Sequence, residues 1–203
     1  MATLKALLDS PDQSVRLKAA LSAGTYPESE YIPVLIAQCA IEPDFFVRDT
    51  LSWALMRHDL KEVLPMLTAQ LNSTHNQARS QALHTLSKIG DKSNYGLITH
   101  EHLLDSNDEV ATTAWRSASL LVPDEEKDAL VKILVTQLGR GDGDTQFALT
   151  RFLCAIGEPI VQPLQEVAQS DNETIRLHAE ITLIRYEEMK LEFDKKEPRR
   201  KQQ

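Results

Sequence analysis

Asp44-Phe-Phe-Val-Arg48 repeats an earlier stretch of the same chain, Asp12-Gln-Ser-Val-Arg16. Weaker copies of this Asp-x-x-Val-Arg motif follow at 75–79, 107–111, 142–146 and 173–176, the last one shorter by a residue. The six copies end at residues 16, 48, 79, 111, 146 and 176, which gives steps of 32, 31, 32, 35 and 30 residues. A period near this length is typical of a solenoid of stacked units. We therefore expect one continuous array, in which each unit buries its apolar face against its neighbours.

Each repeat is predicted to contain two helices, A and B, with the motif in B. We number positions from the last residue of the motif, so that Val47, Leu51 and Leu55 stand at −1, +3 and +7 of the second repeat. Apolar residues at this spacing form one stripe along a helix. Helix A precedes the motif. Three copies of helix A carry a proline 15, 14 and 13 residues before the reference position: Pro33, Pro65 and Pro163.

Short polar turns separate A from B, and Asp105-Ser-Asn-Asp108 is an example. Asp, Asn and Ser in such a turn accept hydrogen bonds from the free amides at the start of the next helix. Gly90 and Gly157 follow two of the B stripes, where a glycine often ends a helix. The turns therefore support the assignment of two helices per repeat.

The composition restricts the classes of function. The 203 residues carry a net charge of −8. The segment 194–203 has five basic and two acidic residues, or +3, so the remainder is −11. An acidic body disfavours nonspecific DNA binding and fits protein partners better. Only Cys39 and Cys154 occur, far apart in the array, and we expect no disulfide and a reducing compartment. Without a signal peptide or a long apolar segment, a cytoplasmic protein with no membrane contact is expected.

Paired helices, a proline in A and Asp-x-x-Val-Arg at the start of B together resemble HEAT repeats. The short bacterial HEAT-like repeats of the phycobilisome lyase type are the most similar kind. The resemblance covers about residues 5–187 and is weakest in repeats four and five, where Ala111 and Gln146 replace the arginine. It implies an all-α fold, a right-handed α-solenoid of about six helical hairpins. The solenoid would span residues 1–187, and 188–203 would form a charged helix extension and a disordered tail.

The resemblance also assigns roles to residues of the motif. In HEAT repeats the arginine and aspartate are structural and link successive turns by charged hydrogen bonds. Four arginines would belong to this scaffold: Arg16, Arg48, Arg79 and Arg176. Most members of the family are scaffolds and adaptors that bind macromolecules on a concave face lined by the B helices. Some bind DNA, including a group of bacterial alkylpurine glycosylases, and others belong to chromophore lyases.

Basic and aromatic residues recur at positions +4, +5 and +9 of the B helices. These are the candidate partner-binding residues of the concave face: Trp53, Arg57, His84, Lys88, Trp115, Arg116, Arg151 and Arg185. Acidic residues concentrate instead around the A helices, as in 124–128. Trp and Arg are frequent at binding hot spots. Two alternatives remain open: the basic side chains could complement helix ends or neighbouring acids on a solvated face, and the tryptophans could belong to the core.

No catalytic residue, metal site or cofactor is predicted. His100 and His102 lie two residues apart, on different faces of a helix, which is a poor arrangement for a metal. Trp115 and Arg151 are similar to groups expected in the glycosylases, but Ser119 stands one turn after Trp115 and no carboxylate accompanies it. We expect a noncatalytic adaptor for a protein or peptide of acidic character. The alternatives are a nucleic-acid binder or enzyme using the same groove, and a lyase-like or chaperone role toward a cofactor protein.

Overall fold

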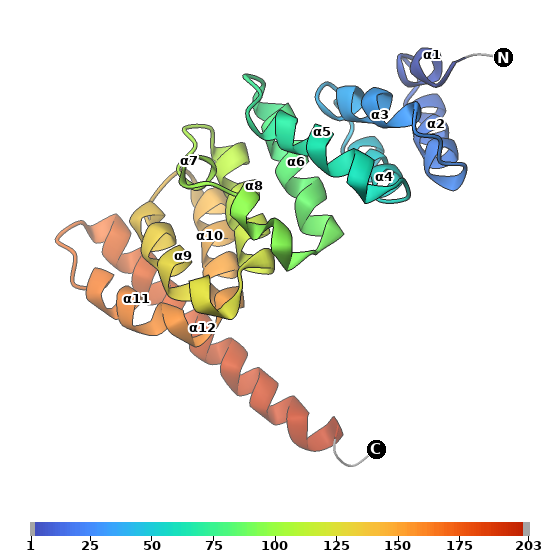
Figure 1. Ribbon diagram of the computed structural model, residues 1–203. Coiled ribbons are helices and arrows are strands. Elements are labelled where there is room, and N and C mark those ends of the chain that lie inside the picture. Colours follow the sequence, from blue (N-terminus) through green and yellow to red (C-terminus); the bar gives the residue numbers. More distant parts are fainter. Residues whose placement is uncertain (1–2, 201–203) are drawn as a thin grey trace.

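The computed structural model describes residues 3–200, with side chains through residue 192, and its helices form consecutive A–B hairpins (Figure 1). The B helices are α2 (Gln13–Thr25), α4 (Phe45–Leu55), α6 (Asn76–Ile89), α8 (Asp108–Leu121), α10 (Gly143–Ile156) and α12 (Glu173–Arg200). The A segments are α1 (Leu4–Leu8), α3 (Tyr31–Cys39), α5 (Leu60–Leu71), η1 (Lys92–Leu97) with α7 (His100–Leu103), η2 (Asp124–Glu126) with α9 (Lys127–Leu134) and η3 (Val135–Gln137), and η4 (Glu158–Ile160) with α11 (Val161–Val167). No strand occurs within residues 3–200, and the predicted α-solenoid is confirmed.

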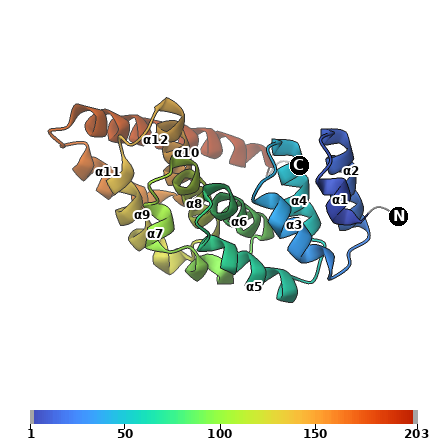
Figure 2. The ribbon, with the colours of Figure 1, turned by 90° about the horizontal axis from the view of Figure 1, so that it is seen from above.

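The hairpins stack into two layers. Figure 2 shows the B helices along one side of the array and the A helices along the other. Each B helix packs against the next one, from α2 and α4 to α10 and α12. One surface of the molecule, which we call the B face, is therefore formed by B helices.

The predicted apolar stripe of helix B forms the core between the two layers. Val47, Leu51 and Leu55 of α4 are completely buried, as are Val110, Ala114 and Ala118 at the same positions of α8. Small residues at +3, such as Ala114, let the helices approach closely. The hydrophobic period seen in the sequence therefore identifies the buried side of each B helix correctly.

The Asp of the motif caps helix B. The Asp12 carboxylate accepts a hydrogen bond from the amide of Ser14 at 2.8 Å, and the Asp44 carboxylate accepts one from the amide of Val47 at 3.0 Å. Each bond satisfies an amide that has no partner within the helix. At the other end of α6, Gly90 adopts a left-handed φ of 72°, which favours glycine because it has no Cβ.

The recurring proline lies near the start of two of the three A helices. α3 and α11 begin two residues before Pro33 and Pro163, in the first turn, where the missing amide costs no hydrogen bond. Pro65 lies further inside α5. The proline therefore marks the first turn of α3 and α11 and interrupts neither helix.

The last helix is longer than the others and continues beyond the hairpin it belongs to. α12 packs on α10 and α11 and then extends away from the array to Arg200 (Figure 1). The boundary expected between residues 187 and 188 falls within this continuous helix. Of the tail predicted to be disordered, residues 201–203 lie outside the described part. No helix in the described residues is long and apolar enough to cross a membrane.

Candidate binding face

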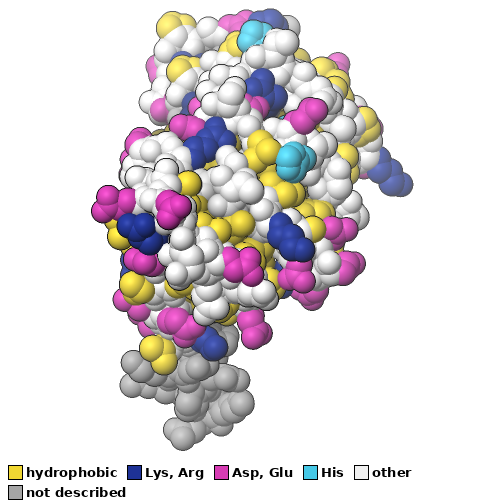
Figure 3. All heavy atoms as spheres, turned by 90° about the vertical axis from the view of Figure 1, so that its left-hand side faces the viewer, with side chains coloured by type: hydrophobic (Ala, Val, Ile, Leu, Met, Phe, Trp, Pro, Cys, Tyr) yellow, Lys and Arg dark blue, Asp and Glu magenta, His cyan; other side chains and the backbone are white. Residues whose placement is uncertain are grey.

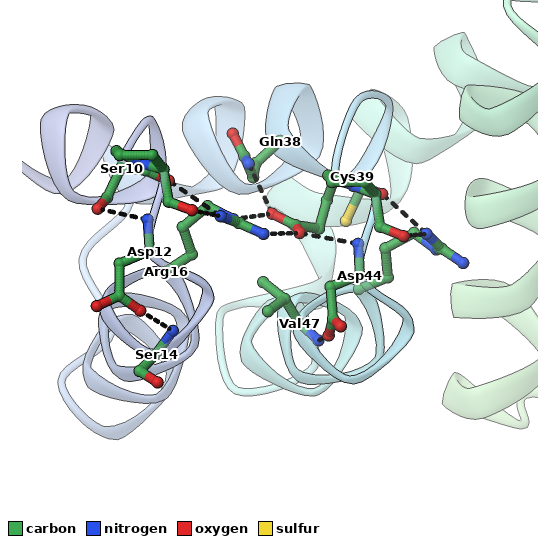
Figure 4. Close-up of polar contacts among 12 residues, drawn as sticks. Ser10, Asp12, Ser14, Arg16, Gln38, Cys39, Asp44 and Val47 are labelled. Carbon is green, nitrogen blue, oxygen red and sulfur yellow. Dashed lines mark hydrogen bonds and ion pairs between the residues drawn. The ribbon is translucent and has the colours of Figure 1, made fainter.

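An internal network of arginines joins neighbouring repeats. The guanidinium of Arg16 donates from Nε and Nη2 to the two carboxylate oxygens of Glu42, both at 2.8 Å, and so links α2 to the turn before α4 (Figure 4). Glu42 is completely buried and also accepts hydrogen bonds from Gln38 and the amide of Asp44. Burial raises the pKa of Glu42, but these hydrogen bonds outweigh it and hold the pKa below its ordinary value. Glu42 is therefore an ionised, buried part of the scaffold.

The motif arginines share one target, the backbone carbonyl at position −6 of their own repeat. Arg16 donates to Ser10 at 3.0 Å, Arg48 to Glu42 at 2.9 Å, Arg79 to Ser73 at 2.8 Å and Arg176 to Ser170 at 2.9 Å. These carbonyls lie in the turns, outside regular hydrogen bonding. All four arginines are thus structural, but only Arg16 and Arg79 also reach the next repeat, as predicted.

The carboxylates that pair with these arginines are not those of the motif. Arg79 pairs with Asp105 at 2.9 Å, as Arg16 pairs with Glu42. Both acids stand at position −6 of the following repeat, two residues before the capping position. The expectation that the motif aspartates Asp12 and Asp44 link successive turns is wrong, because they cap the B helices instead.

In repeat four, which lacks the motif arginine, an arginine of the next repeat donates the equivalent hydrogen bond to the turn. Position 111 is alanine, yet the carbonyl of Asp105 at −6 accepts a hydrogen bond from Arg140. Arg140 also donates to the Asp108 carboxylate at 2.8 Å. In repeat five, Gln146 makes only two long contacts of 3.4 Å, with the carbonyls of Gly139 and Gly141. The turn of the fourth repeat therefore still receives a hydrogen bond from an arginine, and the turn of the fifth repeat receives only weak ones from Gln146.

Trp115 belongs to this scaffold and not to a binding face. It is completely buried, its indole N–H donates to the carbonyl of Leu103 at 2.8 Å, and the Arg140 guanidinium lies 5.7 Å from its ring centroid. The prediction that Trp115 contacts a partner is wrong. The alternative of a core tryptophan holds, because position +4 of helix B points toward the next repeat.

Trp53 differs from Trp115 in its exposure. It lies on the B face of α4 and is 37% exposed. A Cβ at Gly24 of α2 would come within 2.4 Å of the Trp53 ring, so this close approach requires the glycine. Trp53 is therefore fixed at its inner edge and free at its outer edge, which suits an aromatic contact with a partner.

Two of the predicted basic residues contact a carboxylate of the protein itself. Lys88 and His84 of α6 both contact one carboxylate oxygen of Asp49 on α4, at 2.5 and 3.3 Å. Burial lowers the pKa of His84 more than the hydrogen bond to Asp49 raises it, so the ring is neutral at pH 7. Sequence reasoning missed Asp49 because it stands at +1, outside the columns considered. Its spacing of one turn from Trp53 on the B face was the available signal.

Three predicted arginines remain available. Arg57, Arg116 and Arg151 are exposed, and among the described residues no carboxylate lies within ion-pair distance of them. Arg151 lies over the ring of Phe152 at 5.7 Å. Arg185 is exposed too, but it pairs with Glu188 at 2.9 Å. The B face thus combines free guanidinium groups on α8, on α10 and in the turn after α4 with a partly exposed tryptophan.

A groove of about 380 Å³ lies between α10 and α12 on this face. Its apolar lining comes from Phe147, Leu177 and Ile181, which are 53%, 45% and 54% exposed, and Arg185 stands at its edge. These apolar residues were not among the predicted contacts. Figure 3, which views the side of α9–α12, shows apolar side chains gathered among charged ones.

The described residues also include potential metal ligands and two thiols. No group of three or more His, Cys, Asp and Glu side chains there could hold a metal ion. Cys39 and Cys154 are free and buried, and burial raises the pKa of their thiols to about 12 and about 11. Such thiols are protonated and unreactive at neutral pH.

The HEAT-repeat family model matches residues 1–87, which include three of the four repeats that keep the motif arginine. No curated protein matches the sequence. Among solved structures, an engineered protein is 21% identical, with 91% of this chain and 95% of that chain covered and a TM-score of 0.48. The CpcE–CpcF complex of phycocyanin lyase from Nostoc sp. PCC7120 is 20% identical, with 88% and 75% covered and a TM-score of 0.49.

Proposed function

We propose, from the premise that this chain is a HEAT-repeat protein, that it is a noncatalytic adaptor whose B face binds an acidic protein or peptide. One observation carries the proposal: Arg57, Arg116 and Arg151 are exposed on one face and have no carboxylate partner in the described part of the chain. The protein as a whole is acidic, with a net charge of −8. Basic groups left free on one face of an acidic protein suit an acidic partner.

The chemistry of the guanidinium group supports a carboxylate-bearing partner. Its planar donors match the two oxygens of a carboxylate, and it is hydrated more weakly than an ammonium group. Trp53 would supply an apolar anchor on the same face. Acidic residues of this chain, such as Asp124 and Asp128, lie in A segments, where they would not repel the partner.

Nucleic acid is the second candidate, because the same three arginines could contact phosphates. Against it stands the acidic charge of the whole chain, since nonspecific binding depends on neutralising many phosphates. A lyase-like or chaperone role toward a cofactor protein would use the same face. A cytoplasmic location also belongs to the proposal, and the two free thiols support a reducing compartment.

The test is a matched pair of charge-reversal variants. Arg116→Glu with Arg151→Glu changes the B face, while Lys61→Glu with Lys132→Glu makes the same change of four charges at exposed lysines of A helices. Proteins captured from the native cell by wild type would be identified by mass spectrometry and the main partner purified. We expect the B-face variant to lose binding at least about tenfold, because like charges across an interface cost several kcal/mol. The A-helix variant should bind as wild type does.

The dependence of binding on salt separates the two candidates. Phosphate contacts release counterions, so binding to nucleic acid would weaken steeply between low and moderate salt. An acidic protein partner gives a shallower dependence. If the B-face variant captures the same partners with wild-type affinity, the B face is a solvated surface and the proposal fails.

A further inference from the structure

The groove between α10 and α12 differs from the middle of the B face in having apolar walls. Phe147 of α10 forms one wall, and Leu177 and Ile181 of α12 form the other. They stand at positions +1 and +5 of their helices. At the same positions the two middle repeats carry polar residues: Ser80, His84, Thr112 and Arg116. The apolar walls are therefore a property of this part of the array and not of the repeat in general.

The exposure of these walls does not result from the position of α12 at the end of the array. Position +5 is also exposed in repeats that another repeat follows, as Trp53, Arg116 and Arg151 show. Phe147 is 53% exposed although α12 lies beside it. Position +5 thus faces solvent along the whole B face, and Ile181 is exposed for the same reason. What occupies the groove therefore need not be a further repeat.

Positive charge lies at one end of the groove. α10 and α12 run in the same direction, because Thr150 contacts His178 and Cys154, one turn later, contacts Thr182. Arg185 lines the groove, and it stands one turn after Ile181. Arg151 stands one turn after Phe147 on α10, so both arginines lie toward the same end. Among the described residues that line the groove, none is acidic.

The floor of the groove is polar, but its groups already have partners. Thr150 and His178 are each only 4% exposed. Nδ1 of His178 accepts a hydrogen bond from the amide of Gly139 at 3.0 Å, so the ring proton is on Nε2, which lies 3.1 Å from the Thr150 hydroxyl. Burial lowers the pKa of His178, and the ring is neutral. The floor therefore offers no charge to a ligand, which would be held by the walls and by the arginines.

We propose that this groove binds a large apolar side chain of the acidic partner, whose next carboxylate but one is held by Arg151 and Arg185. This proposal rests on the proposed function and specifies the partner further. Each arginine stands four residues, or about 6 Å of helix, after an apolar wall residue. In an extended segment, residues i and i+2 are about 6–7 Å apart. The partner segment is thus extended, with a large apolar residue and an acidic residue two positions later.

Arg185 can serve the partner although it already has an ion pair. It contacts Glu188 at 2.9 Å, and both side chains are more than half exposed. An exposed pair within one helix contributes little to stability, so exchanging Glu188 for a carboxylate of the partner costs little. Arg151 has no carboxylate to release within the described part of the chain.

Fluorescence anisotropy with short acidic peptides tests the proposal. Three labelled peptides of one length differ at a single position, which holds Leu, Phe or Ala, and all carry Asp two residues later. The full chain should bind the Leu and Phe peptides about tenfold more tightly than the Ala peptide, because only a large side chain fills the groove. Replacing the Asp by Asn should weaken binding of the Leu peptide, since it removes the charge that faces the arginines.

Variants of the walls locate the binding site on the protein. Ile181→Ser and Phe147→Ser each remove one apolar wall and should bind the Leu and Ala peptides nearly equally. The matched control is Leu21→Ser, which makes the same kind of change at position +5 of α2, where the side chain is 45% exposed. It should keep the preference of wild type. Far-ultraviolet circular dichroism and melting check that all three variants are folded.

The results separate this proposal from the proposed function. If wild type binds all three peptides equally and Arg116→Glu with Arg151→Glu binds none, the acidic partner stands and the groove proposal fails. If Leu21→Ser loses the preference and Ile181→Ser keeps it, the apolar side chain binds at the other end of the array, which also overturns the proposal. A wild type that binds no acidic peptide at millimolar concentration would contradict both.

Discussion

The three repeats of the first half all hold their turns with their own motif arginine, whereas in the second half only the sixth repeat does so, through Arg176. In the first three, each turn carbonyl at −6 receives a hydrogen bond from the arginine of its own B helix, as with Arg48 and Glu42. In the fourth, the carbonyl of Asp105 receives its bond from Arg140 of the next repeat. The family model matches only residues 1–87, where the arginine stands in its usual place. The comparison shows that the carbonyl at −6 of the turn requires a hydrogen-bond donor. The motif arginine is one residue that can supply it.

The largest effect should follow from breaking the buried ion pair of the first half. Arg16→Ala leaves the carboxylate of Glu42 buried without its main partner, which typically costs about 3–5 kcal/mol. Urea unfolding of wild type and variant measures the loss. Arg16→Ala combined with Glu42→Gln should be more stable than Arg16→Ala alone, because no uncompensated charge remains. Equal stability of wild type and Arg16→Ala would show that the pair is not a structural link.

In the second half, Arg140→Ala should cost about 2–3 kcal/mol, because four contacts are lost together: those to Asp105, Asp108, Gln137 and the Trp115 ring. Adding Ala111→Arg to this variant would put an arginine back in the position used by the first half. If the turn geometry is the same in both halves, the double variant should unfold at higher urea than Arg140→Ala. A double variant less stable than the single one would mean that the two turns differ.

A direct comparison of equivalent positions should give a smaller effect. Arg48→Ala removes two charged hydrogen bonds of 2.9 and 2.8 Å to backbone carbonyls and should cost about 1–3 kcal/mol. Gln146→Ala removes only two contacts of 3.4 Å and should change the melting temperature little. The surface variant Arg151→Ala serves as the baseline. A loss for Gln146→Ala as large as that for Arg48→Ala would contradict the difference between the halves.

Acid should reveal the contribution of Glu42 through the pH dependence of stability. Its pKa is held below the ordinary value, so its stabilising effect is full above the unfolded pKa of about 4.3 and is lost as the pH falls through the folded pKa. The melting temperature of wild type should therefore drop below about pH 4. Glu42→Gln should melt lower at pH 7 and show a shallower decline over the same range. Parallel curves for the two proteins would exclude this role.

The sequence predicts the fold well because its main signals are local. The apolar stripe, the capping Asp12 and Asp44 and the glycine at the end of α6 act within a few residues of each other, and each predicted element is present. Replacement of a scaffold residue from another repeat is not a local signal. Arg140 stands 35 residues from Asp105, and only the stacking of the repeats brings them together.

The candidate site is predicted less completely, because periodicity identifies a face but not its contacts. Arg57, Arg116 and Arg151 are exposed, as a binding role requires. Position +4 turns into the next repeat, which buries Trp115 while position +5 leaves Arg116 in solvent. Lys88 stands at one of the predicted positions, but its ammonium group forms an ion pair with Asp49. Whether a charge is available to a partner depends on its neighbours in space, and these come from different repeats.

The placement of Arg140 also bears on how such a chain can change over evolution. A repeat that contains its own donor and its own acceptor is a module: it can be duplicated, deleted or exchanged and still satisfy its turn. The fourth repeat is not one, because the donor for its turn is encoded in the fifth. A deletion of the fifth repeat would also remove the hydrogen bond that Arg140 donates to the turn of the fourth repeat. Repeats four and five must therefore be inherited together, and the ion pairs Arg16–Glu42 and Arg79–Asp105 join repeat one to two and repeat three to four in a similar way.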